Sequence, residues 1–118
     1  MKTTYKNYQN LFEAIEANKN SKEIISQLPK RMNKANWSAF LDQDDQSRIT
    51  KIILSFEKDI SSPKLQFILS SDSSDLKIKS SSIGEMFYDD LIKLIEDCKK
   101  EAMHILLQLN IEIMFKDT

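Results

Sequence analysis

The stretch from Ser82 to Leu109 most constrains the fold, because its apolar residues recur at every third or fourth position. Such spacing places side chains in one stripe along a helix. Ser82 and Glu85 have the spacing of a capping box, and Lys99 and Lys100 lie toward the end that the helix dipole makes favourable for cations. The pattern predicts one long amphipathic helix with a buried stripe made of Phe87, Leu91, Leu94, Ile95, Cys98, Ala102, Ile105, Leu106 and Leu109.

The N-terminal third also has helical spacing. The spacing of the apolar residues between positions 6 and 17 predicts a first helix over this range. Ser21 is the expected N-cap of a second, shorter helix, and Pro29 should end it at or before Leu28. Residues 32–41 predict a third helix, although only part of their apolar set lies on one face.

Residues 46–60 fit two structures. Five apolar residues match helical spacing, which favours a helix. Alternation of Ile52, Leu54 and Phe56, together with the density of β-branched residues, leaves a strand as the alternative. We favour the helix, on the spacing of Ile49, Ile52, Ile53, Phe56 and Ile60.

A small sheet is predicted further along the chain. Residues 65–69 and 76–78 alternate between apolar and polar, with a Ser- and Asp-rich loop between them, as in a β-hairpin. An isolated hairpin is marginally stable in water, so a third strand is expected. The alternation after Leu107 suggests that the long helix breaks near Asn110 and that Ile111–Phe115 supply this strand. The predicted fold is therefore a helix-dominated α+β single domain spanning residues 1–118 with an antiparallel sheet; an all-α bundle is the alternative.

Composition excludes several classes of protein. The chain has 118 residues, the length of one domain, and 30% of them are charged. No run approaches the ~20 apolar residues of a membrane span, and no apolar block follows Lys2 as in an export signal. A single Gly, at position 84, argues against phosphate loops and dinucleotide-binding turns. We expect a cytoplasmic protein with no membrane partner and no cofactor.

Catalytic and metal sites are not expected either. Cys98 and His104 are the only residues of their types, and a separation of six points them to different sides of a helix. Asp89 and Asp90 are adjacent, so their carboxylates diverge and cannot act as a pair. The sequence therefore predicts a protein that is not an enzyme, with no catalytic residues and no metal ligands.

An acidic cluster is the candidate binding site. Asp42, Asp44 and Asp45 resemble the start of a calcium loop, but Ser47 stands where Gly is needed and Ile53 where a bidentate Glu is needed. The cluster is then either a solvated turn or a surface that binds a partner. We take Asp42, Asp44 and Asp45 as candidate partner-binding residues.

Charge is distributed unevenly: residues 1–41 carry +4 and residues 42–118 carry −5. A basic run that ends at a tryptophan is typical of proteins that bind nucleic acid. Here, however, acidic residues follow the run directly, and the net charge of the chain is −1. We therefore expect a protein partner, basic in character, and a non-catalytic inhibitor of the immunity or antitoxin type. A secretion chaperone or adaptor, and a nucleic-acid-binding protein, are the alternatives. The basic run comprises Lys19, Lys22, Lys30, Arg31, Lys34 and then Trp37.

Overall fold

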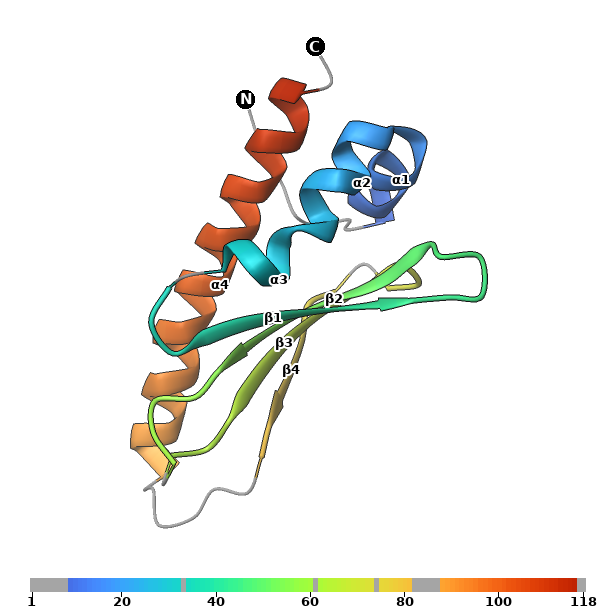
Figure 1. Cartoon of the computed structure of the whole chain (residues 1–118). Coiled ribbons are helices and arrows are strands. Elements are labelled where there is room, and N and C mark those ends of the chain that lie inside the picture. Colours follow the sequence, from blue (N-terminus) through green and yellow to red (C-terminus); the bar gives the residue numbers. More distant parts are fainter. Residues whose placement is uncertain (1–8, 33, 61, 74, 82–87, 117–118) are drawn as a thin grey trace.

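The computed structural model describes residues 9–32, 34–60, 62–73, 75–81 and 88–116. Within these residues, three short helices precede four strands, and one long helix follows them (Figure 1). The strands form an antiparallel sheet in the order β1-β2-β3-β4. The α+β prediction is confirmed, and the all-α alternative is wrong. The elements are α1 (Gln9–Ala17), α2 (Lys19–Ser26), α3 (Leu28–Arg31), β1 (Trp37–Gln43), β2 (Ile49–Phe56), β3 (Leu65–Ser70), β4 (Lys77–Ser80) and α4 (Tyr88–Lys116).

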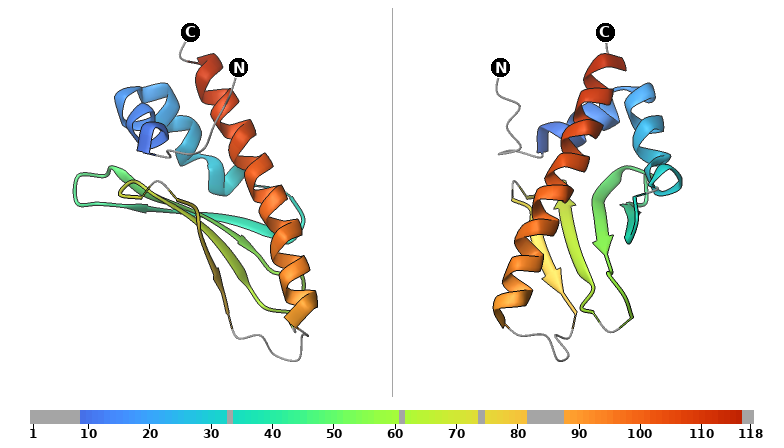
Figure 2. Two further views of the ribbon diagram at one scale, coloured as in Figure 1. Left: turned by 180° about the vertical axis from the view of Figure 1, so that it is seen from behind. Right: turned by 90° about the vertical axis from the view of Figure 1, so that its left-hand side faces the viewer.

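The helices lie together on one face of the sheet, as the three views show (Figures 1 and 2). Register explains which strand residues face them: Ala39, Leu54 and Phe67 are directly opposite one another on neighbouring strands and are all buried. Ile15 of α1 and Leu106 of α4 are fully buried in the same cluster. The core is therefore one layer between the sheet and the helices.

The long helix has the predicted stripe. Leu91, Cys98, Ala102, Leu106 and Leu109 are buried, and three other stripe residues are partly buried against the core. Phe87 and the proposed capping box at residues 82–85 lie outside the described residues. The predicted break near Asn110 and the strand Ile111–Phe115 are wrong, because α4 continues to Lys116. Ile113, four residues after Leu109, is also buried, so the helical stripe simply continues.

The N-terminal helices differ in their boundaries. Asn18, not Ser21, caps α2, since its side chain accepts hydrogen bonds from the backbone of Asn20 and Ser21. Pro29 lies in the first turn of α3, where its missing N–H costs nothing. The predicted helix over 32–41 is wrong. Asn36 has a φ of 69°, and the alternating burial of Trp37 and Ala39 begins β1.

The helix favoured for residues 46–60 is also wrong, and the strand alternative is confirmed over β2. This strand pairs with β1 on one side and β3 on the other. Ile52 and Leu54 face the core, while Ile53 lies opposite Phe40 on the other face. Apolar residues on both faces of a central strand imitate helical spacing, which explains the error.

Within the described residues, no helix is both long enough and apolar enough to span a membrane.

Candidate functional site

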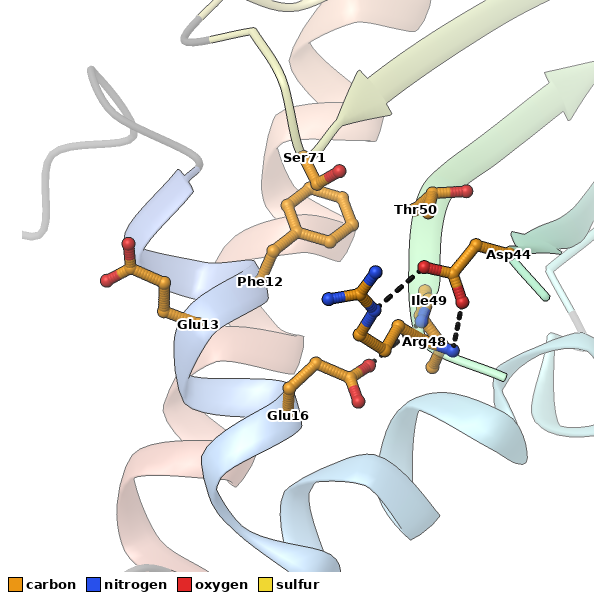
Figure 3. Close-up of a pocket in the computed structure, with 8 residues that line it drawn as sticks. All are labelled: Phe12, Glu13, Glu16, Asp44, Arg48, Ile49, Thr50 and Ser71. Atoms are coloured by element: carbon orange, nitrogen blue, oxygen red, sulfur yellow. Dashed lines mark hydrogen bonds and ion pairs between the residues drawn. The ribbon is translucent and has the colours of Figure 1, made fainter. Parts of the chain in front are cut away.

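A pocket of about 520 Å³ lies between α1 and the hairpin that joins β1 to β2 (Figure 3). Buried Phe12 and Ile49 supply apolar lining, and three carboxylates supply charge. We call it the α1–hairpin pocket. It is lined by Phe12, Glu13, Glu16, Asp44, Arg48, Ile49, Thr50 and Ser71.

Asp44 holds the hairpin turn in place. Its Oδ1 accepts hydrogen bonds from the backbone N–H groups of Gln46 and Arg48, each at 2.9 Å, and its Oδ2 accepts one from Arg48 Nε at 2.7 Å. These bonds, first the one from the Arg48 backbone, lower the pKa of the Asp44 carboxyl. The turn also places Ser47 at a φ of 62°, a left-handed conformation that usually belongs to glycine. Asp44 is thus a structural residue of the turn as well as a wall of the pocket.

Glu16 joins the helical layer to the sheet. Its Oε2 accepts a 2.8 Å hydrogen bond from the backbone N–H of Ile49, at the start of β2. Its Oε1 lies 3.1 Å from Lys22 Nζ, which ties α1 to α2. A partly buried strand N–H needs an acceptor, and this carboxylate supplies it. The pocket wall is therefore fixed by bonds from three elements.

Charge and shape together define what the pocket can hold. Glu13 is exposed at its rim, and Asp45 is exposed in the adjoining turn. Arg48, the cation of the lining, is engaged by Asp44. Carboxylates around an apolar wall suit a lysine or arginine side chain, whose stem is apolar and whose head is charged.

The structure separates the three aspartates of the candidate site. Asp44 faces the pocket, Asp45 is exposed at the turn, and Asp42 is exposed on β1 directly opposite Lys51. Folding instead places Asp44 across the pocket from Glu16 of α1, while the carboxylate of Glu13 lies at the outer rim and points away from Asp44 (Figure 3). The spacing of these two glutamates, three residues apart on a predicted helix, was the sequence signal that they share a face.

The other flagged residues lie elsewhere. Cys98 is buried on α4, where burial, with smaller effects of Glu101 and Asp97, raises the pKa of its thiol to about 11. His104 borders a smaller groove of about 220 Å³ between α3 and α4, beside Arg31 and Lys34 of the basic run. Among the described residues, no three His, Cys, Asp or Glu side chains are grouped so that they could hold a metal ion.

Comparison of the chain with known protein families, with curated proteins and with solved structures finds no match.

Proposed function

We propose that this chain is a non-catalytic protein-binding domain acting in the cytoplasm, an inhibitor of the immunity or antitoxin type. Its partner would insert a lysine or arginine side chain into the α1–hairpin pocket. The observation that carries the proposal is the combination of apolar Phe12 and Ile49 with the carboxylates of Glu16 and Asp44 in one pocket, with Glu13 at its rim.

Rigidity of the site supports this proposal. Glu16 is bonded to β2 and to α2, and Asp44 is bonded across the turn, so two of the carboxylates are held before a partner arrives. A preorganised site loses little conformational entropy on binding. The exposed carboxylates of Glu13 and Asp45 remain at the edge, where charge speeds the approach of a basic partner.

An adaptor is the second candidate function. An inhibitor needs one binding surface, whereas an adaptor needs two. The face of the sheet opposite the helices, on which Phe40 is 52% exposed, favours this alternative.

The experiment is capture of the partner from the native cells by the wild-type chain and by a variant in which a lysine introduced by substitution occupies the pocket. Ser71 lines the pocket and is half-buried, so Ser71→Lys places an ammonium group at the site. Ser26 is exposed on α2, away from the pocket, so Ser26→Lys adds the same charge as a control. Thermal melting of both variants checks that they fold.

We expect wild type and Ser26→Lys to retain one basic protein in a 1:1 ratio, and Ser71→Lys to lose it. Retention of the partner by Ser71→Lys, or the absence of any stoichiometric partner, would contradict the proposed function.

A further inference from the structure

We infer that the face of the sheet opposite the helices is a second binding surface, which takes an acidic amphipathic helix of a partner protein. This surface, the outer sheet face, is distinct from the α1–hairpin pocket and its inference does not depend on that pocket. Its residues follow from the strand register and are Ser38, Phe40, Asp42, Lys51, Ile53, Ser55, Gln66, Ile68, Ser70, Lys77 and Lys79.

An apolar row crosses this face from strand to strand. Phe40 of β1 is opposite Ile53 of β2, Ile53 is opposite Ile68 of β3, and Ile68 is opposite Lys77 of β4. Phe40 is 52% exposed, and Ile53 is partly exposed. Ile68 is buried, yet it is not a member of the core cluster that the helices cover. The row is therefore a separate apolar strip on the far side of the sheet.

No described helix or strand covers this strip. The views agree that α1 to α4 lie on the other face (Figures 1 and 2). Beside the strip, Ser55 is 2% exposed, and its Oγ has no hydrogen-bond partner among the described residues. A covered hydroxyl without a partner is uncommon in proteins.

The charged residues of the outer sheet face indicate that its partner is acidic. Lys77 ends the apolar row, and Lys79 and Lys51 lie in the polar rows on either side of it. All three are exposed, whereas Asp42 is the single acidic residue among those named for this face. A surface of this charge attracts an acidic partner and repels a second copy of itself.

The aliphatic side chains of the apolar row favour a protein partner over a nucleic acid. Single-stranded nucleic acids stack on aromatic side chains, and only Phe40 of this row is aromatic. Ile53 is partly exposed and Ile68 lies buried beside it, so the accessible part of this row next to Phe40 is aliphatic and suits leucine or isoleucine side chains.

The length of the row matches a helix. Neighbouring strands are about 4.8 Å apart, so three residues in a row span roughly 10 Å. Residues i, i+4 and i+7 of a helix span about 10.5 Å along its axis, at 1.5 Å per residue. One helix laid across the strands would thus place three apolar side chains along the row, with the main contacts on Phe40 and Ile53 and the third over the small exposed part of Ile68. A helix on this face would complete a three-layer arrangement, one of the stable ways to cover a sheet.

The test uses the whole chain and a designed helical peptide with leucine at i, i+4 and i+7 and glutamate on its flanks. Its binding is measured by calorimetry and located by backbone amide NMR. The same peptide with lysine in place of glutamate, and an oligo-dT strand, are the comparison ligands.

Two variants probe the surface. Phe40→Ser removes the exposed aromatic on β1, and Lys77→Glu combined with Lys79→Glu reverses the charge at the β4 end of the surface. Ile60→Ser is the matched control, because Ile60 is 99% exposed in the turn after β2 and lies outside the row. All of these side chains are exposed, so the fold should survive, which melting curves check.

We expect the acidic peptide to shift the amides of Phe40, Ile53 and Ile68, and to bind at least about tenfold more weakly to each surface variant but not to Ile60→Ser. Equal binding of the lysine peptide, or amide shifts elsewhere, would overturn the inference. Stronger binding of oligo-dT would assign the face to nucleic acid. A wild-type dimer that Phe40→Ser converts to a monomer would assign it to a second copy.

Discussion

The indole Nε1 of Trp37 donates a 2.8 Å hydrogen bond to Oε2 of Glu101, joining the first residue of β1 to the middle of α4. Trp37 is 6% exposed, and its ring lies 5.1 Å from that of Phe56 and 5.8 Å from that of Phe67, centroid to centroid. The bond satisfies the one polar atom of a ring that is otherwise packed among apolar groups. It fixes where the long helix crosses the sheet.

Removal of this acceptor should destabilise the protein. Glu101→Ala leaves the indole N–H of Trp37 unpaired, which costs about 1–3 kcal/mol in the free energy of unfolding. Glu101→Gln keeps an acceptor oxygen and should lose less. Urea denaturation, followed by the fluorescence of the single tryptophan, measures both changes. Equal stability of Glu101→Ala and wild type would show that the bond does not hold α4 to the sheet.

The buried stripe of α4 predicts a graded loss of stability. Leu106 is 0% exposed, so Leu106→Ala should cost about 2–5 kcal/mol through lost burial and an unfilled cavity. Leu94 is only partly buried and should lose less. Lys93 is exposed, and Lys93→Ala should change stability by no more than about 0.5 kcal/mol. Chemical denaturation of the three variants gives the order, and any other order would contradict the described packing.

The turn after β1 should become more stable with glycine at one position. Ser47 has a φ of 62°, which costs a residue with a side chain about 1 kcal/mol or more. Ser47→Gly should therefore raise the free energy of unfolding by about 0.5–1 kcal/mol. Gln46, its neighbour, is not among the residues with positive φ, so Gln46→Gly should give no gain. A loss of stability in Ser47→Gly would mean that the turn has another conformation.

The thiol of Cys98 should resist alkylation in the folded protein. Burial raises its pKa from 9.0 to about 11, so the reactive thiolate is about 100-fold rarer at neutral pH than in the unfolded chain. Because the unfolded thiol releases its proton first, stability should fall as the pH rises from about 9 toward 11. Iodoacetamide labelling with and without denaturant measures the first effect. Cys98→Ala should show a smaller fall at high pH, and an unchanged fall would remove Cys98 as its cause.

Sequence patterns predicted the elements whose periodicity is unambiguous. The helix stripe from Leu91 to Leu109 and the hairpin of β3 and β4 each follow one period. Strand β2 does not, because Ile53 faces outward between inward-facing Ile52 and Leu54. At the C-terminus, Leu109 and Ile113 fit both a strand and a helix, and only packing against the core decides between them.

The candidate site was predictable in part. Asp44 was identified because acidic residues cluster near it in the sequence, and it does line the pocket. Its neighbours Glu13 and Glu16 lie about 30 residues earlier on α1. They join it only because α1 packs beside the hairpin, where Glu16 accepts a bond from Ile49. That contact depends on tertiary structure, which local spacing does not encode.

The central claim is that the acidic edge of the α1–hairpin pocket attracts a basic protein. Glu13 and Asp45 are the exposed carboxylates there, and neither holds the turn as Asp44 does. The double variant Glu13→Gln, Asp45→Asn removes two charges, and Glu23→Gln, Asp90→Asn removes the same two charge types from exposed positions on α2 and α4.

The decisive measurement is the association rate of the captured partner as a function of salt concentration, by stopped-flow mixing. We predict that the Glu13, Asp45 variant associates several-fold more slowly at low salt and depends less on salt, because charges at an interface edge act mainly on the association rate. The Glu23, Asp90 variant should match wild type. Equal rates and equal salt dependence for the two double variants would contradict the claim.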